Sequence, residues 1–374
     1  MIAACAAITV FGLAFGMSYP LLSLLLEQRG YSAYLIGLNA AMVPLGILVF
    51  SPWIPALARR FGAKGCNIVA ALVIALCLVL YRAIDSLSVW FALRLMQGMA
   101  SAVLYVLSEV WLVRFAGDRY RGRVVSVYAS LLSASFAIGP FLISVLGVEG
   151  WTPFLVGVAV LLIGTVPLVF VREPRSPVPD DQVQGLSVWR FAPLAPVLLF
   201  TVAVFAVMDA SLMALMPVFG LERGLSFETA TLLLSAFVAG NAVLQYPIGM
   251  LADRFDARAV TAGCAAVCAA SFVALPLTVG TVWQWPVVVF GGATGFGIYT
   301  VSLKALGDRF SGDVLVAGTS AVGVVWGGGA LIGAVLGGWS MTAFGANGLP
   351  LMLAVFFALL AAALIWRIGH LDSD

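Results

Sequence analysis

Charged residues are scarce in this chain of 374 residues: Asp, Glu, Lys and Arg together make up 10% of it, whereas hydrophobic residues make up 63%. An ordinary soluble domain carries about 25% charged residues, so the composition excludes a water-soluble globular protein. Histidine occurs once, as His370, and the nucleotide-binding pattern G-x-x-x-x-G-K does not occur. ATP-driven chemistry is therefore disfavoured, and so is an enzyme, because the sequence offers no pair of nucleophile and base.

Cysteine is also rare, and its positions disfavour a disulfide framework or a metal site. Cys264 and Cys268 share one helix face, but with a single histidine in the chain we favour buried packing over a metal pair. The net charge of +2 comes without a basic tail, so nucleic acid is not expected as a partner. We expect no cofactor and no metal. The cysteines, all within or beside apolar segments, are Cys5, Cys66, Cys77, Cys264 and Cys268.

Long apolar runs are what the chain has instead. A helix needs about 20 apolar residues to cross the hydrocarbon core of a membrane, and these runs lack the alternation of barrel strands. The sequence predicts an all-α integral membrane protein with twelve transmembrane helices. The first run has no positive region before it, so we expect a retained span rather than a cleaved signal peptide. The runs lie at about 2–26, 33–58, 65–84, 87–114, 123–147, 151–171, 193–219, 227–251, 257–280, 283–306, 314–338 and 348–368.

The chain repeats itself at an offset of 194 residues. The turn Gly249–Phe255 matches a degraded copy at Pro55–Phe61 (249 − 55 = 194). Such a repeat predicts two pseudo-symmetric six-helix halves at 1–171 and 193–374, joined by a cytoplasmic linker at 172–192, with the substrate site between the halves. The same offset relates Arg29, Gly98, Tyr105 and Ser108 to Arg223, Gly292, Tyr299 and Ser302.

Basic residues predict the orientation. If both termini lie inside, most Lys and Arg residues fall in cytoplasmic loops and ends, whereas the outer side holds only Arg29, Arg82 and Arg223. Because cytoplasmic loops are enriched in basic residues, we expect both termini in the cytoplasm and the protein in the bacterial inner membrane.

These motifs resemble those of the major facilitator superfamily over the whole chain. Gly249–Phe255 matches the superfamily's loop motif G-x-L-A-D-R-x after helix 8, and Pro55–Phe61 matches the copy after helix 2, with Arg59 in place of the expected Asp. Arg94, Gln97 and Gly98 resemble the motif R-x-x-Q-G in helix 4.

Further resemblances are weaker. Arg121–Arg123 resembles the basic turn that enters helix 5. Glu109–Leu112 resembles the helix 4 segment of a bacterial branch of the superfamily, in which an acidic residue stands before Trp-Leu. Gly139-Pro140 resembles the core of the motif of antiporters, although Ser135 and Ile143 stand where glycines are typical.

The resemblance implies a transporter in which helices 1, 4, 7 and 10 line the cavity. It also implies that the loop-motif Asp caps a helix of the other half and helps to hold the outward-open state. Because only the second copy keeps the Asp, we expect a latch at the start of helix 5, where an acid is favoured by the helix dipole. The residues expected in gate and latch are Asp253, Arg254, Arg59, Arg60, Glu109 and Arg123.

Two ionisable residues inside the spans are candidates for proton coupling, since charge inside a membrane is costly and marks function. Asp209 is the only acid deep in its span, and its repeat counterpart is Phe15 (209 − 194 = 15). Arg94 begins a polar stripe along helix 4. Two alternatives stay open: Asp209 as a static partner of Arg94, and Arg94 as a brace that bonds neighbouring carbonyls.

Aromatic, methionine and polar side chains on the cavity faces favour an amphiphilic organic substrate, because aromatic rings and methionine adapt to varied apolar shapes. Helix packing explains the same residues about as well. The candidate cavity residues are Phe15, Ser18, Tyr19, Gln97, Ser101, Tyr105, Met213, Asn241, Gln245, Tyr299 and Trp326.

The sequence therefore predicts a monomeric secondary transporter, driven by the proton gradient, that exports a small amphiphilic compound by alternating access. Its partners are a small-molecule substrate, protons and membrane lipid. Two alternatives stay open: an uptake symporter of an organic solute, and a membrane receptor or scaffold that does not transport.

Overall fold

The computed structural model describes the backbone of residues 2–115, 121–170 and 191–371, and the side chains of 8–108, 131–170, 191–312 and 314–367. Within these ranges the chain is helical and has no β-strand. Eleven described helices are long and apolar enough to cross a membrane, and α6 adds a shorter described apolar stretch at Leu131–Leu146. Together they are the twelve helices predicted, so the all-α membrane fold is confirmed.

Two compact units divide the described chain. Unit 1 comprises the described residues of Met1–Gly30 and Asn39–Pro179, and unit 2 comprises those of Tyr31–Leu38 and Asp180–Asp374. Residues 171–190 lie outside the described part of the chain. The boundaries 1–171, 172–192 and 193–374 therefore stay a prediction.

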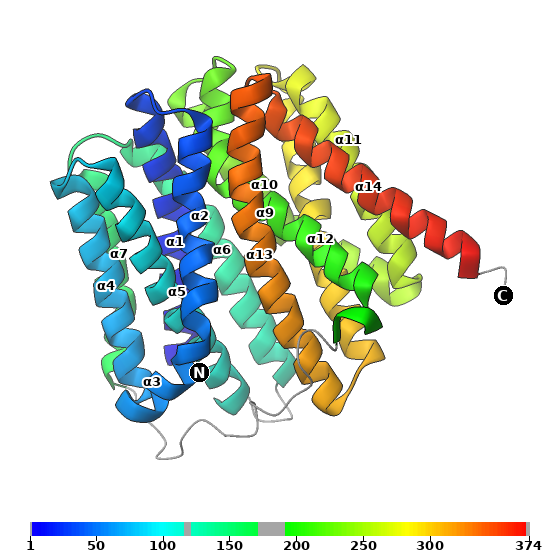
Figure 1. The fold of residues 1–374 in the computed structure, drawn as a ribbon, viewed down its shortest axis with the longest axis horizontal. Helices are drawn as coiled ribbons and strands as arrows, with labels where there is room; N and C mark the ends of the chain where they lie inside the picture. Colours follow the sequence, from blue (N-terminus) through cyan, green and yellow to red (C-terminus); the bar gives the residue numbers. More distant parts are fainter. Residues whose placement is uncertain (1, 116–120, 171–190, 372–374) are drawn as a thin grey trace. The chain divides into compact units, whose positions relative to one another are not determined.

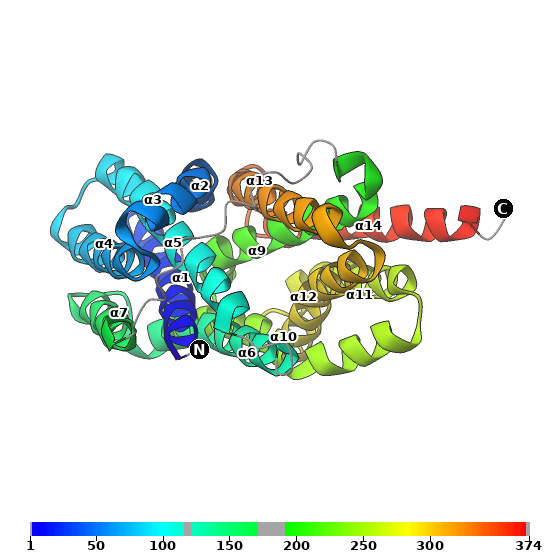
Figure 2. The same cartoon turned by 90° about the horizontal axis from the view of Figure 1, so that it is seen from below.

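In unit 1, α1 packs against α6 and α7, and α4 packs against α5 and α7 (Figures 1 and 2). Apart from the run at about 33–58, the predicted boundaries of these helices agree with the observed ones to within a few residues. The helices are α1 (Ile2–Gln28), α2 (Ala33–Phe50), which belongs to this unit from Asn39 onward, α3 (Ile54–Phe61), α4 (Ala63–Ala83), α5 (Leu87–Phe115), α6 (Arg121–Leu146) and α7 (Thr152–Phe170).

One predicted helix, at about 33–58, is broken. After α2 the chain forms a short 3₁₀ segment at Ser51–Trp53 and resumes as α3. Pro52 and Pro55 explain the break, because proline lacks the backbone N–H that continues a helix and crowds the preceding turn. The hydroxyl of Ser51 donates to the carbonyl oxygen of Ile47 at 2.6 Å and so bonds back to the last turn of α2.

In unit 2, α9 packs against α13 and α10, α10 against α12, and α11 against α12 and α14. Here the second copy of the loop motif stays helical to Arg254. The carboxylate of Asp256 then accepts from the backbone N–H groups of Arg258 and Ala259 and caps the next helix. The helices are α9 (Pro196–Glu222), α10 (Phe227–Arg254), α11 (Ala257–Thr278), α12 (Gln284–Arg309), α13 (Gly312–Phe344) and α14 (Gly348–Leu371).

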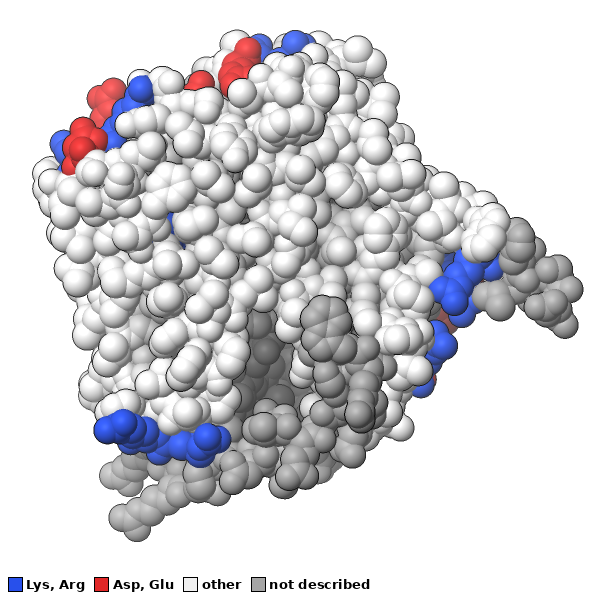
Figure 3. Space-filling view, in the orientation of Figure 1, with Lys and Arg blue, Asp and Glu red and all other residues white. Residues whose placement is uncertain are grey.

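Charged side chains gather where helices end, and the face between these ends is almost entirely uncharged in the view of Figure 3. In unit 1, for example, Arg29 at the end of α1 forms an ion pair of 2.5 Å with Asp85 before α5. This distribution is the one that a lipid environment requires, because charge is costly in the hydrocarbon core.

Candidate binding and coupling sites

Arg94 is the centre of a buried polar network in unit 1. Its side chain on α5 is 1% exposed. The Nε atom donates to Oδ1 of Asn39 on α2, and Nη2 donates to the carbonyl oxygen of Ser18 on α1, both at 3.3 Å. The guanidinium carbon also lies 4.7 Å from the centroid of the Tyr19 ring, a contact that favours a cation.

Gln97 extends this network one helical turn along α5. Its amide nitrogen donates to the hydroxyl of Ser18 at 2.7 Å, and its amide oxygen accepts from the hydroxyl of Tyr81 on α4 at 3.1 Å. Four helices of unit 1 are therefore joined by hydrogen bonds between buried groups. These contacts bring together three of the predicted site residues, Ser18 and Gln97 from the cavity and Arg94 from the proton-coupling pair.

Asn39 and Tyr81 belong to this network and were not among the predicted site residues. Asn39 is 1% exposed, as is Tyr81. The signal for Asn39 was present, since an amide in an otherwise apolar span must find partners. Tyr81 gave no such signal, because a tyrosine near a helix end is also typical of a membrane interface.

The remaining predicted residues of α5 differ in burial. Ser101 is buried, and its hydroxyl has no hydrogen-bond partner. Tyr105 is half-buried, and Ser108 donates to the carbonyl oxygen of Tyr105 at 2.8 Å. The side chain of Glu109 lies outside the described residues.

An aromatic column runs beside the network and ends at Arg94. The rings of Tyr105, Phe11, Phe15 and Tyr19 follow one another with centroid distances of 5.5, 5.1 and 4.8 Å. Phe136 of α6 packs edge-on against Phe11 and Phe15. The predicted cavity residues Phe15, Tyr19 and Tyr105 are thus packed against each other in this conformation.

Asp209 lies in the middle of α9 in unit 2, and its neighbours along the helix are buried whereas Asp209 itself is partly exposed. Among the residues whose side chains are described, none forms a hydrogen bond or ion pair with its carboxyl group. A partnerless carboxyl in a membrane-spanning helix is a functional candidate.

The other predicted residues of unit 2 are distributed over several contacts. Tyr299 on α12 stacks on Phe205 of α9 with centroids 4.6 Å apart, and the amide nitrogen of Gln245 donates to the hydroxyl of Thr300 at 2.6 Å. Met213 and Asn241 are buried. Trp326 packs against the apolar cluster around Phe191 and Leu306, so it is at least in part a core residue.

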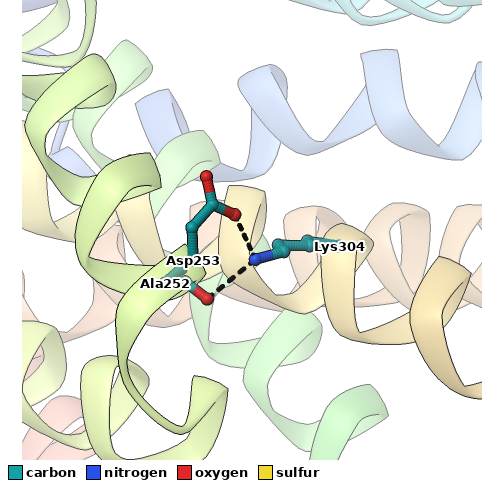
Figure 4. A network of polar contacts seen from close by, with 3 residues as sticks. All are labelled: Ala252, Asp253 and Lys304. Atoms are coloured by element: carbon teal, nitrogen blue, oxygen red, sulfur yellow. Dashed lines mark hydrogen bonds and ion pairs between the residues drawn. The ribbon is translucent and has the colours of Figure 1, made fainter.

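Lys304 is the partner that the structure gives to the second loop motif (Figure 4). Its ammonium group, at the end of α12, donates to the carboxylate of Asp253 and, at 2.7 Å, to the carbonyl oxygen of Ala252. The sequence alone places Lys304 near the end of a predicted span, where a lysine is expected to extend its ammonium group toward the inner membrane surface. Arg254, Arg59 and Arg60 are exposed, and Arg123 lies outside the described side chains.

Gly139, next to Pro140 in α6, marks a close approach of two helices. A Cβ atom on Gly139 would overlap the backbone of Gly16 in α1, and one on Gly16 would overlap the carbonyl oxygen of Phe136. The resemblance to the antiporter motif therefore coincides with tight packing between α1 and α6.

The family model of the Major Facilitator Superfamily matches residues 4–303 and 198–373. The chain belongs to the major facilitator superfamily. The transporter is 26% identical over 372 residues to the uncharacterised MFS-type transporter YfkF of Bacillus subtilis (strain 168), covering 96% of this chain and 92% of the relative. It is 24% identical over 361 residues to YcaD of Escherichia coli O139:H28, covering 96% and 93%.

Solved structures of the same architecture include the nucleoside transporter NupG and a point mutant of NupG. The TM-scores are 0.78 and 0.80, with 13% and 14% identity, and each match covers 98% of this transporter and 98% or 99% of the other chain. At such identity the likeness shows the fold alone. As a member of this superfamily the protein is a multi-pass membrane transporter of small molecules, and it is not an enzyme.

Proposed function

We propose that this transporter exports a small amphiphilic organic compound in exchange for protons, by alternating access in the bacterial inner membrane. The observation that carries the proposal is Asp209, a carboxyl group in a membrane-spanning helix that has no partner among the described side chains.

Asp209 is suited to carry a proton because nothing described neutralises it. A carboxylate paired with a cation would stay ionised in both states of a transport cycle. An unpaired one can bind a proton when water reaches it from one side and release the proton on the other. Inside unit 1 the described hydrogen-bond partners of Arg94 are neutral, and we propose that Asp209 is a proton carrier rather than a static partner of Arg94.

The chemical nature of the substrate is proposed from the residues beside the polar groups. The column of Tyr105, Phe11, Phe15 and Tyr19 is aromatic, and Met213 follows Asp209 one turn along α9. Such side chains accommodate apolar bodies of varied shape. Export is proposed because of Gly139-Pro140, which resembles the antiporter motif and packs on α1.

A flux measurement tests both coupling and direction. Proteoliposomes are loaded with a pH-sensitive dye and a candidate amphiphile, and diluted so that the amphiphile flows outward. Exchange for protons would acidify the interior, whereas symport would make it alkaline, whichever way the protein is inserted. We expect acidification in the wild type and a loss of at least about a hundredfold in Asp209→Asn, the scale of a lost proton-transfer group.

Asp85→Asn is the matched control, because Asp85 is an exposed carboxylate in an ion pair with Arg29 at a helix end. It should transport like the wild type. Undiminished proton-coupled flux in Asp209→Asn would contradict the proposed role of Asp209. An alkaline interior in the wild type would contradict proton exchange and would favour an uptake symporter instead.

We also propose that the loop motif acts as a latch, with Lys304 as an alternative partner of Asp253. In the present conformation Lys304 neutralises Asp253, so the acid is not available to cap another helix.

Asp253→Asn should change the balance of inward-open and outward-open states, measured as cysteine accessibility on the two sides of the membrane. Asp308→Asn, an exposed acid near the end of α12, should leave the balance as in the wild type. If Asp253→Asn also leaves it unchanged, the loop is only a turn.

A further inference from the structure

We infer that the Arg94 network binds the negatively charged group of the substrate, so that the transported amphiphile is an organic anion with a single carboxylate. This inference rests on the proposed function and narrows it. Two observations support it. Among the described residues, the buried charge of Arg94 has no counter-ion, and one hydrogen-bond donor of Arg94 and one of Asn39 have no acceptor.

The charge of Arg94 is not balanced within the described structure. The guanidinium is buried, and its described partners are the amide oxygen of Asn39, the backbone oxygen of Ser18 and the ring of Tyr19, all of which are neutral. Arginine keeps its proton under all ordinary conditions. A buried cation whose partner is missing destabilises a protein strongly. A bound anion would supply the missing counter-charge.

Two donors in the same network lack acceptors. Nη1 of Arg94 and Nδ2 of Asn39 are both buried, and neither has a hydrogen-bond partner among the residues that the structure describes. Each of these side chains already uses its other polar atoms: Arg94 through Nε and Nη2, Asn39 through Oδ1. The missing partner must therefore accept hydrogen bonds. A carboxylate has two oxygens for this purpose and also neutralises the charge, whereas a water molecule accepts hydrogen bonds but carries no charge.

The surroundings of the cation define the rest of the ligand. The aromatic column ends with Tyr19 against the guanidinium, so the groups next to the charge are apolar rings. One arginine balances one negative charge, and a dianion would leave its second charge unpaired among these rings. An aromatic or apolar body with one carboxylate fits both features.

Repeat counterparts support a dedicated role for this network. Its five hydrogen-bonding members have no polar equivalent in unit 2, where Val288, Leu233, Leu212, Leu275 and Gly291 stand at the offset of 194. The helix crossings are nevertheless built in the same way in both units. The fold itself therefore does not require these polar groups.

Binding is tested with three compounds that share one body: 4-phenylbutyrate, its neutral amide and the cationic 4-phenylbutylamine. The purified full-length transporter is held in nanodiscs without a proton gradient, and the midpoint of thermal unfolding is measured as each compound is titrated. We expect the carboxylate to raise the midpoint and the other two to leave it unchanged. Arg94→Gln should weaken the response to the carboxylate by about tenfold or more, the factor that corresponds to about 1.4 kcal/mol. Arg29→Gln, which removes an exposed arginine of the same unit, should preserve it.

Asn39→Asp provides a second measurement that does not depend on the folding of the arginine variant. The change is nearly isosteric and places a carboxylate against the guanidinium. We expect the variant to unfold at a higher temperature than the wild type without ligand, and to lose the response to 4-phenylbutyrate. A lower midpoint with the response retained would overturn the inference.

The inference also fails if the amide or amine stabilises the wild type as well as the carboxylate does. It fails equally if neither 4-phenylbutyrate nor benzoate nor acetate gives a response that depends on Arg94. Its failure is separable from that of the proposed function, because binding is measured without a gradient. Arg94-dependent carboxylate binding without proton-linked flux would overturn only the coupling. If proton-linked flux of a neutral compound persists in Arg94→Gln, only the inference that the substrate is an anion is overturned.

Discussion

In unit 1, Gly46 of α2 and Gly98 of α5 let two backbones meet, since a Cβ atom on either would overlap the other helix. Gly240 of α10 and Gly292 of α12 do the same in unit 2, at an offset of 194 residues (240 − 46 = 194, 292 − 98 = 194). The crossings are thus duplicated, but the charged residues inside the spans are not. Unit 1 holds Arg94 where unit 2 has Val288, and unit 2 holds Asp209 where unit 1 has Phe15.

This difference shows that the two copies of the repeat share the packing of these crossings but not the charged residues inside the spans. Small residues at a crossing are needed wherever two helices approach closely in a membrane, so both units keep them. A buried charge is costly, so it is retained only where it serves a purpose. In our proposals the cation of unit 1 binds substrate and the carboxyl of unit 2 carries the proton.

The largest effect is expected when the polar group of one unit is placed at the matching position of the other. Val288→Arg places a cation at a position that is 2% exposed, and should destabilise the protein by about 3 kcal/mol or more. Chemical unfolding in detergent measures this. Val282→Arg, at an exposed site before α12, should change stability by less than about 0.5 kcal/mol. If both variants are equally stable, an arginine can be buried at this position without a polar network. The network around Arg94 is then not needed to stabilise its buried charge.

Intermediate and equal effects are expected at the duplicated crossings. Gly98→Ala and Gly292→Ala force a Cβ atom against the backbone of the facing helix, and each should lower the free energy of unfolding by about 1–3 kcal/mol. Gly65→Ala and Gly263→Ala, helical positions with open space at the Cβ, should be neutral or stabilising by up to about 1 kcal/mol. A loss confined to one unit would show that the crossings are not equivalent.

The smallest effect distinguishes Arg29 from its repeat counterpart Arg223. Arg29 pairs with the carboxylate of Asp85, whereas Arg223 donates to the carbonyl oxygen of Pro276 at 3.0 Å. Arg29→Gln should cost up to about 1 kcal/mol at low salt, and less in high salt because exposed ion pairs are screened. Arg223→Gln should depend less on salt, since its acceptor is neutral. Equal salt dependence in thermal melts would contradict this distinction.

Much of the site could be predicted because charge in an apolar span is visible in the sequence. The charged residues Arg94 and Asp209 were identified in this way. Gln97 was identified by its place on the polar stripe that Arg94 begins, and Ser18 by its place on the predicted cavity face of the first span. The partners were harder, because Asn39 and Tyr81 lie on other helices and only packing brings them to Arg94 and Gln97. Lys304 was interpreted as a surface residue, since helix periodicity gives the direction of a side chain but not the element it meets. The break before α3 was missed although Pro52 and Pro55 lie in the sequence.

The sequence by itself determined the membrane environment, the twelve helices, the repeat and the family, because these depend on composition, run length and local motifs. The tertiary structure decided which polar atoms found partners and which did not. That Arg94 is bonded to neutral groups, that one of its nitrogens and one of Asn39 lack acceptors, and that Asp253 meets Lys304 all depend on distances between helices far apart in the chain. Hydrogen bonds and ion pairs act over a few ångströms, and only the packed helices set such distances.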